Sequence, residues 1–539
     1  MKLLRSAIAV SALLALTLTA CTTSKPAQNE NKPEAAAVKK GPNGEKYGGT
    51  YHVAISSEPP LVDPQVDTSL QVYNMSRNIF STLLRYKGDT LELEPELLAE
   101  MPKASADGKT YSFKLKDGIA FSNGAKLTAK DVKFTFERML LPATKAANGW
   151  LLSQIVGAKD VTGGKATELA GLKVTGDLTF EITLADPYTP FLQSLANPGL
   201  SIFPAEYATQ KGDKFGREPI GTGPFILKVW KQNDQLVLEK NPNYYEKGLP
   251  YLDKIEYRII ADSATSWLEF QSGNTEEGAP PTSEEKATRE SGKYQVNDIV
   301  SLNTYYLALD TKTYSNPKLR EAISLAIDRQ AIVNAVYNGK GKVATSFVTP
   351  GIPGALKNGA GFPFDAAKAK QIIKDNKLEG TKIEVWQRGG DKVTDANLAI
   401  QQMLQDVGLV YDVQIKDKAT FNAARGKGQI PAQQGNWFAD FPDPDNYLYT
   451  FLFSKESVKM SVNYANADVD AKLTEARTST DKAKREAIYQ EVEKKLLYEE
   501  YAILPLYHIT STDYLQKWVK GYPKDQLRVG GMKGVWLDK

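Results

Sequence analysis

Apolar and polar positions follow two periods along the chain, and these periods predict strands as well as helices. The segments 50–55 (TYHVAI) and 110–115 (TYSFKL) are rich in β-branched and aromatic residues, and the second alternates with the period of two that is typical of a half-buried strand. In 74–84, by contrast, Met75 and Ile79 stand on a helical period with two later leucines, which predicts a helix.

Terminal residues mark further helices. Thr128 can cap a helix whose third position is Asp131, and Pro317 stands where an N-terminal proline is tolerated. Amphipathic patterns predict helices over 394–407 and 481–500 as well. Strands and helices alternate in mixed order, without an internal repeat. The pattern therefore predicts a mixed α/β (α+β) protein with parallel and antiparallel pairing, but it does not define the topology.

Cys21 is the only cysteine of the 539-residue chain, and it ends the sequence Leu-Thr-Ala-Cys. Residues 1–20 carry Lys2 and Arg5 and then an apolar stretch shorter than the roughly 20 residues that span a bilayer, which is the layout of an export signal. Leu-x-Ala-Cys resembles a bacterial lipobox, in which the cysteine is lipidated and holds the mature protein at a membrane. The alternative is an ordinary secretory signal with an incidental cysteine.

The segment 21–46 is expected to be a flexible tether. After Cys21 it has a single valine, no aromatic residue, and many Lys, Asn, Pro, Ala and Glu residues. Such a composition does not bury enough apolar area to fold. Folded sequence is therefore expected to begin near Tyr47.

Composition narrows the function of the remaining chain. It is long enough for roughly two or three domains. With 67 basic and 64 acidic residues, two of the basic ones in the signal, the mature chain is almost neutral, so no nucleic-acid partner is expected. His52 and His508 are the only histidines, no His/Cys cluster has zinc spacing, and neither a nucleophile elbow nor a P-loop occurs. We therefore expect no metal, no cofactor and no enzymatic activity, with an enzyme that uses carboxylates as the alternative left open in principle.

Several motifs match one family in order along the chain. They are 106–118, 121–124, 127–134, 220–225, 258–260, 271–273, 303–306, 320–329 and 437–446 (WFADFPDPDN). In this order they resemble the extracytoplasmic solute-binding proteins of peptide ABC transporters, family 5, which include oligopeptide- and dipeptide-binding lipoproteins. The resemblance extends from about Tyr47 to the C-terminal region.

The resemblance implies a periplasmic-binding-protein-like fold of two lobes, with an extra domain inserted in lobe one. Transferred to this sequence, lobe one consists of 47–70, 207–296 and 508–539, the inserted domain is 71–206, and lobe two is 297–507. The chain would cross between the lobes twice, which allows hinge closure. A monomer is expected.

A receptor for varied peptides should hold the groups that all peptides share, namely the backbone, the ammonium and the carboxylate. Asp440 resembles the family's amine-binding aspartate. Asn436, Trp437 and Phe438 match the segment that pairs with the ligand backbone, although Trp437 could equally be a core aromatic residue. For Asp443 and Asp445, which stand in a Pro-containing turn, turn formation and capping are the favoured roles.

The opposite side of the cleft is matched less closely. Ser57 and Glu58 match the second ligand-pairing segment, but two prolines follow and remove N–H donors. Arg388 lies where dipeptide-binding members place a carboxylate-binding arginine, while Gln434 replaces an arginine of some oligopeptide-binding members. Tyr305, with its neighbours Asn303 and Tyr306, either lines the cleft or packs at the lobe boundary.

These expectations describe a lipid-anchored, extracytoplasmic peptide receptor that delivers its ligand to a membrane-embedded ABC permease. Another ligand on the same scaffold, such as a nickel chelate, haem, an oligosaccharide or an opine, is the first alternative. The second is an extracytoplasmic enzyme or a chaperone-like surface protein.

Overall fold

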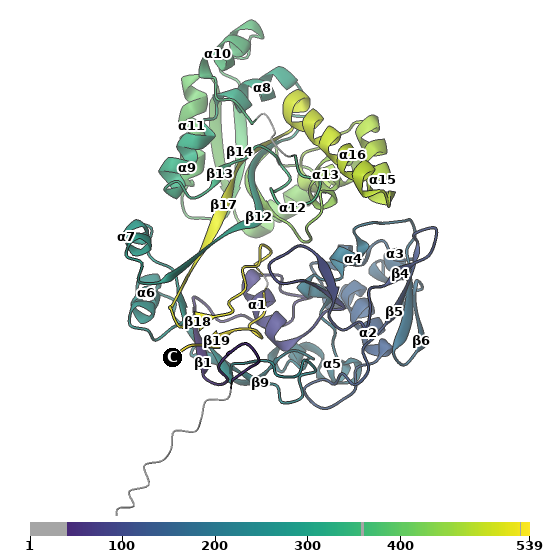
Figure 1. Ribbon diagram of the computed structural model, residues 1–539. Helices are drawn as coiled ribbons and strands as arrows, with labels where there is room; N and C mark the ends of the chain where they lie inside the picture. The colour runs from purple at the N-terminus through teal and green to yellow at the C-terminus, as the bar shows by residue number, and fades with distance from the viewer. Residues whose placement is uncertain (1–39, 357–360, 529) are drawn as a thin grey trace, which may run out of the picture. The chain divides into compact units, whose positions relative to one another are not determined.

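The computed structural model describes residues 40–356, 361–528 and 530–539 (Figure 1). The expected export signal and Cys21 lie outside the described residues. Lys46, which the sequence assigned to the tether, forms an ion pair with Asp538 at 2.8 Å. A four-stranded sheet follows in the order β1-β10-β9-β8, with β1 parallel to β10 and the other pairs antiparallel. Its strands are β1 (Thr50–Ile55), β8 (Phe225–Lys231), β9 (Gln235–Lys240) and β10 (Lys254–Ile259).

A second, seven-stranded sheet has the order β11-β17-β12-β16-β14-β15, with β13 also paired to β17. Its strands are β11 (Glu277–Gly278), β12 (Gln295–Leu309), β13 (Lys342–Val343), β14 (Lys382–Arg388), β15 (Val410–Lys416), β16 (Ala432–Phe438) and β17 (Ile503–Leu515). The long strands β12 and β17 pair antiparallel from Gln295↔Leu515 to Ala308↔Ile503. In Figure 1 they form a ribbon between two groups of elements. The chain therefore runs from one group to the other along β12 and returns along β17.

Helices cover both faces of the large sheet. Alternate residues of β12 point to different cores: Leu307 and Leu309 pack with α8–α11, whereas Tyr306 and Ala308 pack with α13, α15 and α16. The helices of this region are α8 (Pro317–Ala326), α9 (Arg329–Tyr337), α10 (Ala366–Asp375), α11 (Asp395–Asp406), α12 (Lys418–Gly426), α13 (Asp445–Leu452), α14 (Ser454–Ser457), α15 (Ala467–Thr478) and α16 (Lys482–Lys495).

A third sheet has the order β4-β5-β7-β6 and a hydrophobic core of its own. Along the chain, its strands lie between β1 and β8 of the first sheet. Its strands are β4 (Lys103–Ala104), β5 (Thr110–Lys114), β6 (Leu172–Gly176) and β7 (Thr179–Thr183), accompanied by the hairpin β2 (Leu84–Tyr86) and β3 (Leu93–Pro95). The remaining elements are α1 (Leu70–Ile79), α2 (Ala129–Leu140), α3 (Ala158–Thr162), α4 (Phe191–Ser194), α5 (Ala205–Lys211), α6 (Ser263–Gln271), α7 (Glu285–Glu290), β18 (Val519–Lys520) and β19 (Trp536–Leu537).

Local signals correctly marked several boundaries. Helix α2 begins after Thr128, whose N–H and hydroxyl both donate to the carboxylate of Asp131 at 2.8 Å. Pro317 is the first residue of α8, and Thr394 caps α11. The mixed α/β class is confirmed. Within the described ranges, no helix has the length and apolar character needed to cross a membrane.

The helix predicted over 74–84 is wrong in position, since α1 ends at Ile79. A close approach of the chain terminates it: the N–H of Gly223 donates to the carbonyl of Ile79 at 2.8 Å. A Cβ atom on Gly221 would lie 2.2 Å from that carbonyl oxygen, so only glycine fits there. The glycines of the motif 220–225 therefore have a packing role. Met75 and Ile79 of α1 belong to the core of the first sheet.

Candidate ligand-binding site

Strand β16 leaves part of one edge unpaired. Along its other edge it pairs with β12, and the N–H of Ala439 just beyond it donates to the carbonyl of Leu302 at 2.8 Å. Because successive residues of a strand point their polar groups to opposite edges, the N–H and C=O of Asn436 and Phe438 face away from β12. There β14 meets β16 only at Gln433, and no described strand pairs with the stretch that follows.

A cavity of about 470 Å³ lies at the end of this free edge. Asn436, Phe438 and Asp440 line it, and Arg388 of β14 reaches it from the neighbouring strand. Further walls come from Tyr73 of α1, Tyr86, Asn148 and Asn197, which are distant in sequence. The structure thus brings together four of the residues that the sequence suggested as ligand contacts.

Asp440 has no cationic partner among the described residues. Its Oδ2 accepts from Nδ2 of Asn446 at 3.4 Å, its N–H donates to Oδ1 of the same residue at 3.1 Å, and its carbonyl accepts from Asn197 at 3.0 Å. Burial raises the pKa of Asp440 to about 6, and the hydrogen bond from Asn446 acts in the opposite direction. At neutral pH the cavity therefore contains a negative charge that a bound ammonium could neutralise.

Trp437 faces away from this cavity. Its indole N–H donates to Oδ1 of Asn446 at 3.0 Å, and its ring meets Phe451 edge-on with centroids 5.2 Å apart. Of the two roles that the sequence left open, packing is the one that these contacts support, since Trp437 alternates with the cavity-facing Asn436 and Phe438.

The turn after Asp440 is held by ion pairs. Asp443 accepts two hydrogen bonds from Arg485 at 2.5 and 2.8 Å, and Asp445 accepts from Arg477 at 3.0 and 3.2 Å. The hydroxyl of Tyr188, which belongs to the region of the third sheet, also donates to Asp445 at 3.1 Å. Both carboxylates are buried. Sequence patterns had pointed only to turn and capping roles and did not reveal the arginines.

A larger cavity of about 820 Å³ adjoins the first one, because Arg388 and Asn436 line both. Tyr305 and Gln434 line it as well, and the ring of Tyr305 also stacks on Tyr507 with centroids 5.0 Å apart, so both roles that the sequence left open for Tyr305 stay possible. Arg388 is exposed and forms no ion pair with any described residue. A second guanidinium, that of Arg425 on α12, also lines this cavity. Sequence reasoning missed Arg425, which stands in an ordinary amphipathic helix without a recognisable motif.

Ser57 and Glu58 lie elsewhere. The carbonyl of Ser57 accepts from Gln71 at 2.8 Å, and Glu58 accepts from Arg217 at 2.8 Å and from the indole N–H of Trp230 at 2.6 Å. The backbone N–H of Asn233 is the main cause of the lowered pKa of Glu58. Neither residue lines the cavities described above, so the second ligand-pairing segment stays a prediction.

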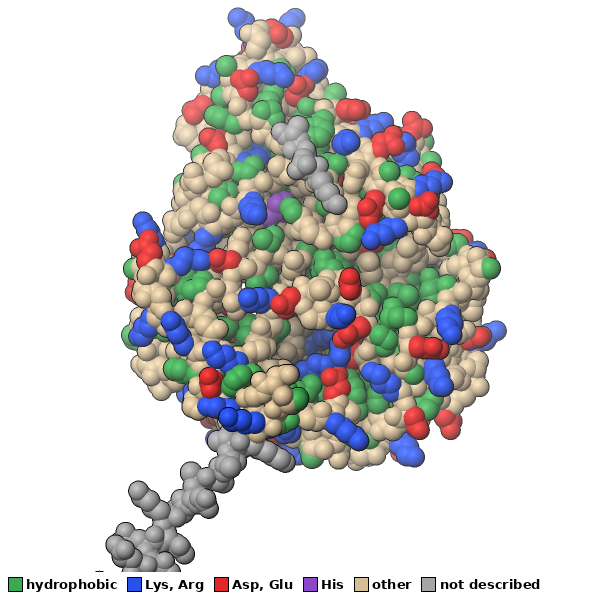
Figure 2. All heavy atoms as spheres, viewed as in Figure 1, with side chains coloured by type: hydrophobic (Ala, Val, Ile, Leu, Met, Phe, Trp, Pro, Cys, Tyr) green, Lys and Arg blue, Asp and Glu red, His purple; other side chains and the backbone are tan. Residues whose placement is uncertain are grey.

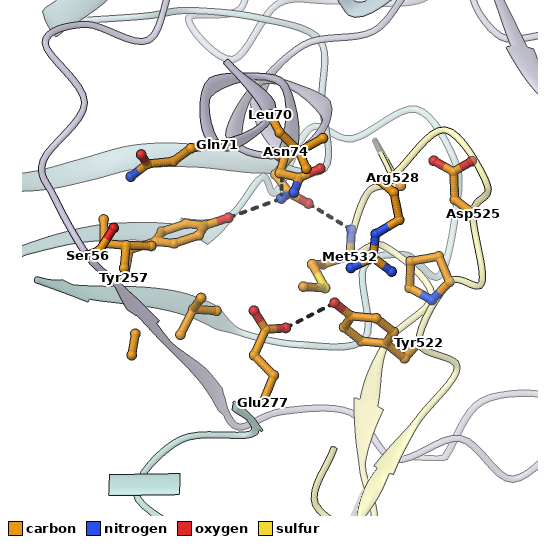
Figure 3. A pocket seen from close by; sticks show the side chains of 16 residues that line it. Ser56, Leu70, Gln71, Asn74, Tyr257, Glu277, Tyr522, Asp525, Arg528 and Met532 are labelled. Carbon is orange, nitrogen blue, oxygen red and sulfur yellow. Dashed lines mark hydrogen bonds between the residues drawn. The ribbon is translucent and has the colours of Figure 1, made fainter. Parts of the chain in front are cut away.

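A third cavity, of about 320 Å³, lies beside β1 and shares Leu70 with the first. In Figure 3 the carboxylate of Glu277 and the hydroxyl of Tyr522 point toward each other in its wall, and the hydroxyl donates to the carboxylate at 3.0 Å. Burial raises the pKa of Glu277. Ser56, rather than Ser57, lines this cavity.

Neither histidine lines a described cavity. Nδ1 of His52 lies 3.1 Å from Glu276, and Nδ1 of His508 lies 3.1 Å from the hydroxyl of Thr304. The described part of the chain holds no group of three or more metal-binding side chains. On the face shown in Figure 2, basic and acidic side chains are interspersed.

Comparisons with known proteins agree with this architecture. The family model "Bacterial extracellular solute-binding proteins, family 5 Middle" matches residues 92–459. The chain is 29% identical over 482 residues to the probable D,D-dipeptide-binding periplasmic protein DdpA of Escherichia coli, covering 87% of this chain and 90% of that protein. It is 27% identical to Heme-binding protein A of Haemophilus influenzae, covering 97% of each.

Among solved structures, the fold is similar to the ABC transporter-associated periplasmic binding protein DppA of Helicobacter pylori in complex with the peptide STSA. The TM-score is 0.77 with 26% sequence identity, and the match covers 92% of this chain and 99% of that one. The expected periplasmic-binding-protein-like fold is confirmed by this similarity.

Proposed function

The chain belongs to family 5 of the bacterial extracellular solute-binding proteins, and from this membership we propose that it binds peptides at the free edge of β16. The ligand backbone adds to Asn436 and Phe438 as an extended strand. Its ammonium pairs with Asp440 and its terminal carboxylate with Arg388. The unpaired edge of β16, which is followed by the half-buried carboxylate of Asp440 without an ion-pair partner, is the observation that carries this proposal.

The positions of the two charges suit a short peptide. Arg388 is the last residue of β14 and Asp440 follows the end of β16, and both line the cavity of about 470 Å³. A cavity of this size is typical of sites for small ligands. Side chains of the ligand can occupy the cavities on either side without specific pairing, so peptides of mixed sequence should bind.

The lobe boundaries expected from the sequence form part of this proposal. We assign 47–70, 207–296 and 508–539 to lobe one, 297–507 to lobe two, and 71–206 to the extra domain inserted in lobe one. The chain crosses between the lobes twice, along β12 and along β17. The register of the ribbon shifts between Val300 and Thr304. Such an irregularity suits a hinge.

Delivery to a membrane-embedded ABC permease is the role of the bound complex. The protein performs no chemistry and acts as an extracytoplasmic monomer, anchored through lipid on Cys21 after removal of the signal 1–20.

Cys21→Ser should release the mature protein from membranes without changing peptide affinity. Fractionation of cells with both forms checks this expectation, and equal membrane retention would contradict the lipid anchor.

Amine recognition provides the direct test of the proposed site. Tetrapeptides with a free or an N-acetylated amine are titrated calorimetrically into the wild type and into Asp440→Asn, with the exposed Asp213→Asn as control. We expect acetylation to cost the wild type about 2–5 kcal/mol of binding free energy, because it removes one partner of a buried charge pair. Asp440→Asn should no longer distinguish the two forms. Equal binding of both peptides by the wild type would refute the role of Asp440.

A haem ligand is the second candidate, because a relative covering nearly the whole chain is named a haem-binding protein. The absorption spectrum of the purified protein with added haemin separates the two proposals. A Soret shift combined with no binding of any peptide would favour haem.

A further inference from the structure

Two guanidinium groups line the cavity of about 820 Å³, and neither is held in an ion pair by a described carboxylate. Neither Arg388 nor Arg425 forms an ion pair within the described ranges. Arg425 is partly buried at the end of α12, whereas Arg388 is exposed at the end of β14. The terminal carboxylate of a peptide neutralises only one of these charges, so the site has capacity for a second anionic group.

Tyr306 adds an unused hydrogen-bond donor to the same cavity. Its side chain is only 2% exposed, and its hydroxyl has no hydrogen-bond partner among the described residues. A Cβ atom on Gly435 would lie 3.4 Å from this hydroxyl, so the hydroxyl sits directly against β16. Because Tyr306 lines the cavity, its hydroxyl is available there to donate a hydrogen bond to a ligand group.

The three groups lie close enough to influence one another. Burial raises the pKa of Tyr306 to about 12, and the positive charges of Arg425 and Arg388 act in the opposite direction. Burial lowers the pKa of Arg425, and the charge of Arg388 lowers it further. All three residues line the same cavity, so an anion bound between them would meet two positive charges and one hydroxyl donor.

The other charged residues of the cavity do not cancel the positive electrostatic potential of Arg388 and Arg425. Asp391, Lys392 and Asp395 also line the cavity, but all three are exposed. Screening by solvent weakens exposed charges more than partly buried ones. The partly buried Arg425 therefore dominates the inner part of the cavity.

We propose that Arg425 and Tyr306 form a pocket for an acidic side chain of the ligand, so that this protein prefers peptides ending in Glu or Asp. This inference rests on the proposed function, in which Arg388 holds the terminal carboxylate. The side-chain carboxylate accepts from the Arg425 guanidinium and from the Tyr306 hydroxyl. The ligand class is thus a short peptide with two carboxylates at its C-terminal end.

Two peptides that differ only in charge test the pocket. Calorimetric titration of Ala-Ala-Ala-Glu and Ala-Ala-Ala-Gln into the wild type should give at least about tenfold tighter binding of the Glu peptide, because a charge-assisted pair is lost with Gln. Arg425→Gln should remove this preference and leave affinity for the Gln peptide unchanged. Tyr306→Phe should reduce the preference by a smaller factor.

Control variants distinguish a loss of the preference for Glu from a loss of folding and from a failure of peptide binding as a whole. Lys427→Gln removes one positive charge from the exposed residue that follows α12 and should keep the full preference. Arg388→Gln should weaken both peptides alike. Equal affinity of the wild type for both peptides, or equal weakening of both by Arg425→Gln with an unchanged melting temperature, would overturn the inference alone. Failure of every peptide to bind would overturn the proposed function and the inference with it.

Discussion

The end of β16 and the turn that follows it contain carboxylates in opposite surroundings. In the turn, Asp443 and Asp445 are buried and each pairs with an arginine, Arg485 or Arg477. At the end of the strand, Asp440 has only the amide of Asn446 beside its carboxylate. The same residue type, within six positions, is thus neutralised in one place and left charged in the other.

We interpret this difference as one between a structural role and the ligand-binding role proposed for Asp440. The paired carboxylates join segments that are distant in sequence, since Asp445 also accepts from Tyr188 and Tyr489. The unpaired carboxylate faces a cavity. Because a charge that is partly removed from solvent and lacks a partner is unfavourable, we infer that a bound ligand neutralises Asp440. The predictions below test this distinction.

The largest effect should come from the paired region. Asp443→Ala leaves the Arg485 guanidinium buried without its partner, so the free energy of unfolding should fall by about 3–5 kcal/mol. Urea denaturation followed by circular dichroism measures the change. Glu456→Ala, which breaks the exposed pair with Lys459, is the control and should cost less than about 1 kcal/mol. Similar losses in both variants would show that the buried pair stabilises the fold no more than the exposed pair does.

Asp440 should show the opposite behaviour, because its charge opposes folding of the unliganded protein. Its folded pKa is about 6 against an ordinary 3.8, so stability is highest below the lower value and is lost as pH rises through the higher one. Relative to Asp440→Asn, the wild type should lose roughly 2 kcal/mol between pH 4 and pH 7. Denaturation curves of both proteins across this range check the sign. A wild type that gains stability with pH, relative to the variant, would contradict the unpaired state of Asp440.

Glu58 should give the smallest effect. Both of its oxygens are occupied by groups of its own region, at 2.6–2.8 Å, so it resembles the paired carboxylates more than Asp440. Glu58→Gln should lower the free energy of unfolding by about 1 kcal/mol and leave peptide affinity unchanged. Calorimetric titration of the same tetrapeptides measures the second part. Loss of affinity would place Glu58 at the ligand, as the sequence resemblance implied.

Local patterns determined much of the secondary structure. The strand 50–55 was predicted with the bounds of β1, and Thr128, Pro317 and Thr394 marked the beginnings of α2, α8 and α11. These signals are carried by neighbouring residues, since caps, proline and alternation act within one element. The order of motifs also identified the family and, with it, the two-lobe fold class.

Pairing between distant segments was decided by tertiary structure alone. The end of α1 depends on Gly221 and Gly223, more than a hundred positions away, so the helical pattern over 74–84 could not reveal it. Likewise, nothing in the motif 437–446 distinguishes Asp440 from Asp443 and Asp445 electrostatically. Their difference arises because Arg477 and Arg485 pair with the carboxylates of the turn, whereas no described cation forms an ion pair with Asp440. Whether a buried carboxylate forms an ion pair or stays unpaired depends on which cations lie beside it, and these contacts form only when the chain folds.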